Sequence, residues 1–176
     1  VEIGAAARAA QRETLGDEGA RLCSSSPALP DSFAGVLLAN ELIDAAERPM
    51  VIFGGGCVDC AEEARAFLRK SGATAVTTTA GKGVIADSDP ATLGSSLQSE
   101  ATQKALTEAD LVIAVGTELA ETDHWSNSLT FHGKLIRIDL DAPTLSRDYT
   151  PTIAILGDAG ESGQGRGRLR RRAVGC

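Results

Sequence analysis

The sequence predicts an α/β fold, a doubly wound and mostly parallel sheet with helices on both faces. Short apolar runs recur along the chain and are separated by stretches of ~10–20 residues, most with helical periodicity. Aromatic residues make up only 3% of the 176 residues, so the core must be built from Ala, Val, Ile and Leu. That composition is typical of strands that are buried on both faces.

Five apolar runs are expected to form the strands of this sheet, because each is short, rich in β-branched residues and bounded by turn-forming residues. They comprise residues 50–53, 73–77, 111–115, 134–138 and 153–156.

Four helices are predicted between or before these strands. Residues 33–47 carry apolar side chains at helical spacing, and Arg48-Pro49 ends that helix. Further helices are expected at 59–71, at 102–107 and from Pro143 onward. Residues 118–133 are polar and are predicted to form a long, solvated connection.

The chain is predicted to contain three parts. Residues 1–35 are rich in Ala, Gly, Ser and Pro and are interpreted as the end of a preceding domain plus a linker. Residues 36–160 form the folded domain. Residues 161–176 hold five arginines and one acid, and are interpreted as a disordered tail.

Charge and hydropathy restrict the classes of partner. Removing the tail's net +4 from the formal charge of −7 leaves −11 for residues 1–160, which argues against nucleic-acid binding. No apolar run approaches the ~18 residues that span a bilayer, and no signal-peptide pattern opens the chain. We therefore expect a cytoplasmic protein with neither a nucleic-acid nor a membrane partner.

A ligand crevice is expected at one edge of the sheet. Four of the predicted strands end in, or run directly into, a small or acidic residue, namely Gly54, Thr77, Gly116 and Asp139. Because the carboxyl ends of parallel strands lie at the same edge, this pattern indicates a nucleotide-type site.

The turn Gly54-Gly55-Gly56 after the first strand has two interpretations. The glycines could let a phosphate approach the backbone at a helix N-terminus, or they could only let strand and helix pack closely. A dinucleotide fingerprint needs a glycine at the position held by Asp59, so ordinary NAD binding is not expected.

Cysteine and histidine give little indication of chemistry. Cys57 and Cys60 have CxxC spacing at a predicted helix start, which could stabilise a thiolate, but we favour two small residues at a tight turn. No second CxxC pair exists, and His124 and His132 lack nearby ligands, so no metal site is predicted.

Five segments in order resemble a known family. They are Arg48–Gly56, Thr77–Gly83, Glu108–Thr117, Ile136–Asp141 and Gly157–Ala159. Their succession is similar to the central domain of thiamine-diphosphate-dependent enzymes of the acetolactate synthase and 2-oxo acid decarboxylase group, over residues 36–160. The resemblance implies a Rossmann-like fold of the DHS-like FAD/NAD-binding type.

The resemblance also implies what lies around this domain. A pyrimidine-binding domain would precede it and a diphosphate-binding domain would follow, and together they would hold thiamine diphosphate and Mg²⁺. The parent enzyme, a lyase or transferase and a homo-oligomer, would decarboxylate a 2-oxo acid or join it to a second carbonyl compound. The family's Gly-Asp-Gly motif is absent from this sequence. We therefore expect a central-domain fragment that has no catalytic residues and is inactive alone.

Some members of that family bind FAD or ADP in this domain, so a stand-alone nucleotide-binding module is the alternative. The resemblance would place glycines near phosphates, threonines near the flavin or its ribityl chain, and acids near the ribose or adenine. The residues concerned are Gly54, Gly55, Gly56, Thr78, Thr79, Gly116, Asp139 and Asp158.

Two departures argue against FAD. Glu118 occupies the position at which flavin binders carry an arginine for the diphosphate, and residues 97–100 lack their Met-His-Gly-like turn. A carboxylate repels a diphosphate. Glu121 or Asp123 could instead tune substrate choice in the parent enzyme, although a solvated loop is favoured.

Overall fold

The structure is a computed structural model that describes residues 41–159. The predicted linker at 1–35 and the predicted tail at 161–176 lie outside the described residues, as does the start of the helix predicted at 33–47. Residues 41–45 are helical and form the described end of that helix.

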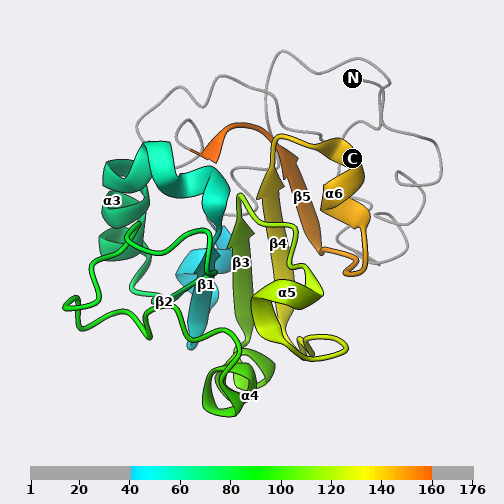
Figure 1. The fold of residues 1–176 in the computed structure, drawn as a ribbon, viewed down its shortest axis with the longest axis horizontal. Coiled ribbons are helices and arrows are strands. Elements are labelled where there is room, and N and C mark those ends of the chain that lie inside the picture. Colours follow the sequence, from blue (N-terminus) through cyan, green and yellow to red (C-terminus); the bar gives the residue numbers. More distant parts are fainter. Residues whose placement is uncertain (1–40, 160–176) are drawn as a thin grey trace.

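Five parallel strands form one sheet in the order β2-β1-β3-β4-β5, with β2 and β5 at its two edges (Figure 1). The predicted α/β class with a doubly wound parallel sheet is therefore confirmed. All five predicted strands are present, with bounds that differ by no more than one residue. They are β1 (Pro49–Phe53), β2 (Thr74–Thr77), β3 (Leu111–Val115), β4 (Lys134–Asp139) and β5 (Ile153–Leu156).

Alternate residues of the strands fill two cores, one on each face of the sheet. Val51, Phe53 and Ile113 belong to one core, whereas Ile52 and Val112 belong to the other. Since both faces are covered, β1, β3 and β5 are apolar along their whole length and not alternately polar.

Helix α3 (Ala61–Ser71) covers the first face and ends at Gly72, whose left-handed φ of 62° suits a glycine. The opposite face packs against α4 (Glu100–Glu108) and against α5 (Glu121–His124) with its flanking loops. Helix α6 (Ala142–Ser146) lies against β4 and β5. None of the described helices is long and apolar enough to cross a membrane.

Two predictions about local structure need correction. A 3-10 helix, η1 (Gly55–Cys60), begins within the glycine turn and precedes α3, so the α-helix begins at Ala61 and not at the predicted residue 59. Residues 118–133 are only partly solvated: they contain α5, and Leu119, His124 and Leu129 are 1%, 2% and 6% exposed. The two leucines join the core on the α4 face, which explains their burial.

Candidate functional site: the crevice at the carboxyl edge

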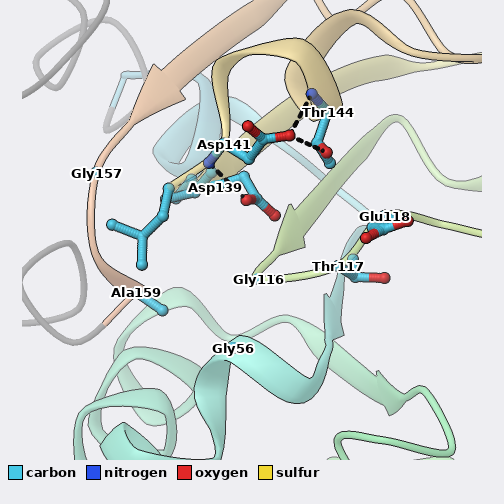
Figure 2. Close-up of a pocket in the computed structure, with 11 residues that line it drawn as sticks. Gly56, Gly116, Thr117, Glu118, Asp139, Asp141, Thr144, Gly157 and Ala159 are labelled. Atoms are coloured by element: carbon cyan, nitrogen blue, oxygen red, sulfur yellow. Dashed lines mark hydrogen bonds between the residues drawn. The ribbon is translucent and has the colours of Figure 1, made fainter. Parts of the chain in front are cut away.

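A crevice of about 370 Å³ lies at the carboxyl ends of β1, β3, β4 and β5 (Figure 2). Gly56 and Gly116 line it where β1 and β3 adjoin, which is the topological switch point at which sheets of this order bind ligands. Asp139 and Asp141 lie at the end of β4, on the opposite side of the opening from Gly56. The full lining comprises Gly56, Gly116, Thr117, Glu118, Ile138, Asp139, Leu140, Asp141, Thr144, Gly157 and Ala159.

The glycines at the switch point bring two stretches of backbone into direct contact. A Cβ on Gly54 would lie 2.2 Å from the Gly116 oxygen, and a Cβ on Gly56 would lie 2.9 Å from the Gly116 Cα. Gly116 itself has a φ of +58°, which disfavours any side chain. The glycines are thus required for packing between the turns after β1 and β3.

Backbone N–H groups of the glycine turn donate to protein carbonyls. Gly54 N donates to Val115 O at 2.9 Å, Gly56 N to Gly116 O at 3.0 Å, and Cys57 N to Gly54 O at 3.1 Å. A phosphate cradle needs such groups to point at the ligand. In addition, the first turn of α3 carries Glu62 and Glu63, which counter its positive N-terminal dipole.

The carboxylates at the end of β4 hold the local backbone. Asp139 Oδ1 accepts a hydrogen bond from Asp141 N at 2.9 Å. Asp141 Oδ2 accepts from Thr144 N at 3.2 Å and from Thr144 Oγ1 at 2.7 Å, which fixes the start of α6 (Figure 2).

Glu118, across the crevice, lies 3.6 Å from the Arg147 guanidinium, and both side chains are more than half exposed. The lining holds three carboxylates, and the amides of its glycines Gly56 and Gly116 donate to protein carbonyls. The crevice therefore does not fit the diphosphate of FAD, ADP or thiamine diphosphate.

The remaining predicted site residues do not line this crevice. Thr78 is buried, donates its N–H to Phe53 O at 3.0 Å and accepts from Gly81 N at its Oγ1, so it shapes the turn after β2. Gly55 faces Ala80, while Thr79 and Asp158 are exposed. The crevice therefore brings together Gly56, Gly116 and Asp139 of the eight predicted residues.

Arg137 is a structurally important residue that the sequence did not reveal. It is 1% exposed, and its guanidinium donates to Thr117 O at 3.1 Å, Glu118 O at 3.2 Å and Arg147 O at 3.0 Å. Burial lowers the pKa of Arg137, although the carboxylates of Asp139 and Asp148 oppose that shift. Arg137 stands between two isoleucines in a predicted strand, and no sequence signal indicated this role.

The cysteine pair is unsuited to thiolate chemistry. Cys57 is fully buried with its Sγ 3.4 Å from Val115 O, and burial raises its pKa to about 12. Burial also raises the pKa of Cys60. Both thiols are therefore protonated at neutral pH, which supports the interpretation as small residues at a turn. Within residues 41–159, no group of three or more His, Cys, Asp or Glu side chains is placed to hold a metal ion.

Comparison with known families decides which class of protein has this fold and crevice. Residues 37–164 match the family model described as "Thiamine pyrophosphate enzyme, central domain". The chain belongs to this family. The predicted resemblance to the central domain of acetolactate synthases and 2-oxo acid decarboxylases is thus confirmed.

Curated relatives of this central domain are much longer proteins. It is 40% identical over 121 residues to the protein named "Probable 2-ketoarginine decarboxylase AruI" from Pseudomonas aeruginosa, covering 69% of this chain and 22% of that protein. It is 33% identical over 141 residues to an acetolactate synthase large subunit from Parasynechococcus marenigrum, and 32% over 135 residues to a pyruvate oxidase from Lactiplantibacillus plantarum. These matches cover 76% and 74% of this chain, and 22% of each relative.

A solved structure supports the same fold. The central domain superposes with a TM-score of 0.61 and 20% identity on an enzyme from Mycobacterium smegmatis assigned as thiamin diphosphate-dependent. The match covers 80% of this chain and 28% of that one. The chain thus spans between a fifth and a third of the length of these relatives.

Proposed function

We propose that this central domain serves a thiamine-diphosphate-dependent enzyme that decarboxylates a 2-oxo acid, and that other domains carry out the chemistry. The observation that supports this most is the match over residues 37–164 to a central domain, combined with a crevice that does not fit a diphosphate. A central domain of this family with such a crevice contributes by holding the other domains of the enzyme in place.

Decarboxylation, with or without transfer to a second carbonyl compound, is the reaction we favour. The central domain is 40% identical to a protein named as a 2-ketoarginine decarboxylase, against 33% and 32% for the acetolactate synthase and the pyruvate oxidase. In the complete enzyme, thiamine diphosphate would stabilise the carbanion left after CO₂ departs, with Mg²⁺ anchoring its diphosphate.

The part that this chain's residues play is structural. Gly54, Gly56 and Gly116 join the turns after β1 and β3, and Arg137 fixes the backbone that follows β3. We propose no catalytic acid, base or nucleophile among the described residues, and we expect the isolated chain to be inactive.

Sequencing the DNA on either side of this coding segment, then expressing the resulting protein, tests the proposal. We expect reading frames for a preceding pyrimidine-binding domain and a following domain with the Gly-Asp-Gly motif. The purified product should release CO₂ from a 2-oxo acid only with thiamine diphosphate and Mg²⁺. Saturable binding of thiamine diphosphate to the isolated 176-residue chain, measured by calorimetry, would contradict the proposal.

A further inference from the structure

The most exposed large apolar side chain among the described residues is Trp125, the chain's single tryptophan, with 77% of its surface accessible. It follows α5 directly, and its N–H donates to Glu121 O at 2.8 Å, which closes the helix. Tryptophan buries a large apolar area when covered and is enriched in the residues that dominate binding at interfaces. Leaving it in water is unfavourable unless it serves such a contact.

The backbone at Trp125 is also strained. Its φ of +54° and ψ of 25° lie in the left-handed region, which costs a residue with a side chain ~1–2 kcal/mol. Among the described residues only Leu119, Trp125 and Asp148 have positive φ without being glycine, and two of these lie within seven positions of each other. Such strain persists where the surrounding structure enforces it, and it is frequent at functional sites.

A network of hydrogen bonds around the buried His124 enforces the conformation. His124 is 2% exposed, with its Nδ1 2.8 Å from Ser126 Oγ and its Nε2 3.4 Å from the Tyr149 hydroxyl. That hydroxyl also accepts from Leu129 N at 2.9 Å. On the other side, Gln103 Nε2 of α4 donates to His124 O at 2.8 Å.

We name residues 119–131 the tryptophan platform. Leu119 and Leu129 anchor it in the core, and the ring of Phe131 meets that of Tyr149 edge-on at 5.5 Å. The segment is thus fixed at several points while it presents one large apolar side chain to solvent. A rigid anchor of this kind binds with little loss of conformational entropy.

We propose that Trp125 is the anchor with which this central domain docks onto the thiamine-binding domains of the complete enzyme, an inference that rests on the proposed function. The occupant follows from chain length, because this chain spans only 22% of its curated relatives and matches their central domain. Neighbouring domains of the same protein must therefore lie against it.

The chemistry of the docking site on those domains follows from the residues around the tryptophan. Glu121, Thr122 and Asn127, within four positions of it in the sequence, are exposed. An apolar recess that accepts the indole, rimmed by hydrogen-bond donors or a cation facing Glu121, complements this surface. An apolar centre inside a polar rim is the usual anatomy of such interfaces.

Oxidation of the indole by N-bromosuccinimide, located by peptide mass spectrometry, tests the proposal directly. In the full 176-residue chain alone, Trp125 should be oxidised rapidly at every protein concentration. In a chimera in which residues 37–164 replace the central domain of the 2-ketoarginine decarboxylase relative, oxidation of Trp125 should slow at least tenfold. If Trp125 were protected from oxidation in the isolated chain, the chain's own termini would cover the indole. If protection grew with protein concentration, a second copy would cover it. Either result would overturn the proposal.

Binding in trans provides a second readout. The thiamine-binding domains of the same relative, with the central domain replaced by a flexible linker, are titrated with the chain. Trp125→Ala should weaken binding about 30-fold, the change that ~2 kcal/mol at a dominant interface residue produces. Val58→Ala, at a 52% exposed apolar residue on η1, should change it less than twofold.

Equal effects of the two variants, or an unprotected indole in the folded chimera, would reject the docking role. If the linker version does not fold, the chimera decides the question alone. Loss of the proposed decarboxylase function would appear separately, as a correctly assembled chimera with a protected Trp125 but without CO₂ release.

Discussion

The carboxyl-edge crevice and the tryptophan platform adjoin in the chain at Glu118 and Leu119, and they differ in how their polar groups are used. At the crevice, the amides of Gly54 and Gly56 donate to protein carbonyls, and the carboxylates of Asp139 and Asp141 accept from neighbouring backbone. At the platform, internal bonds instead hold an indole in solvent. A glycine-rich turn at a switch point therefore predicts a ligand only where its hydrogen-bond donors remain available.

Arg137 connects the two regions. Its guanidinium bonds the carbonyls of Thr117 and Glu118, which border the crevice and lead directly into the platform at Leu119. A third bond, to Arg147 O, ties the same group to the segment after α6. One buried side chain therefore holds the backbone at the border between the two regions.

The largest effect on stability is expected from adding a methyl group at the glycine turn beside the crevice. Gly54→Ala places a Cβ 2.2 Å from Gly116 O and 2.5 Å from Thr117 Cβ, so backbone must move. We expect a loss of about 3 kcal/mol or more in the free energy of unfolding, measured by urea titration. Gly72→Ala is the control: its φ is +62° but no atom lies within 4 Å of the added Cβ, so the loss should be about 1 kcal/mol. Equal losses would mean that the glycine turn is not a packed junction.

Replacing Arg137, which bonds the backbone between the two regions, should have the next largest effect on the free energy of unfolding. Arg137→Met removes the donor of the Thr117 and Glu118 carbonyls, whereas Arg147 O still accepts from Tyr149 N at 2.6 Å. The change should cost about 2–3 kcal/mol of unfolding free energy, again from urea titration. Arg147→Met removes only the exposed pair with Glu118 and should cost less than about 1 kcal/mol. A nearly neutral Arg137→Met would show that the carbonyls find other partners.

The smallest change in the free energy of unfolding is expected at the tryptophan platform, where a substitution should stabilise the chain. Trp125→Gly relieves the left-handed backbone strain and should stabilise the isolated chain by about 1 kcal/mol in thermal or urea unfolding. Trp125→Ala keeps that strain and should change stability by less than about 0.5 kcal/mol, since the side chain is exposed. Destabilisation by Trp125→Gly would show that the conformation is not strained.

The sheet could be predicted from sequence because its signals are local. Each strand is a short apolar run with turn residues at its ends, so Leu111–Val115 and Ile153–Leu156 were predicted with their observed bounds. The residues at the strand ends also predicted a crevice at the carboxyl edge, and Gly56, Gly116 and Asp139 line it.

Burial that depends on distant partners could not be predicted. His124 is buried because Gln103 and Tyr149, which lie 21 and 25 positions away, meet it in space. Arg137 is buried because three carbonyls from two other segments converge on it. Nor does sequence tell whether a glycine amide is bonded, so only the structure, in which the turn packs against Gly116, separates the phosphate and packing interpretations of Gly54–Gly56.

Titration of ADP into the purified 176-residue chain by isothermal calorimetry, at low ionic strength, tests the central claim most directly. ADP carries the diphosphate common to the nucleotides considered for this crevice, and low salt leaves charge effects unscreened. With Glu118, Asp139 and Asp141 in the lining and the amides of Gly56 and Gly116 bonded to protein carbonyls, we expect no saturable heat up to millimolar ADP. Stoichiometric binding in the micromolar range, abolished by Asp139→Ala, would contradict the account and restore the crevice as a nucleotide site.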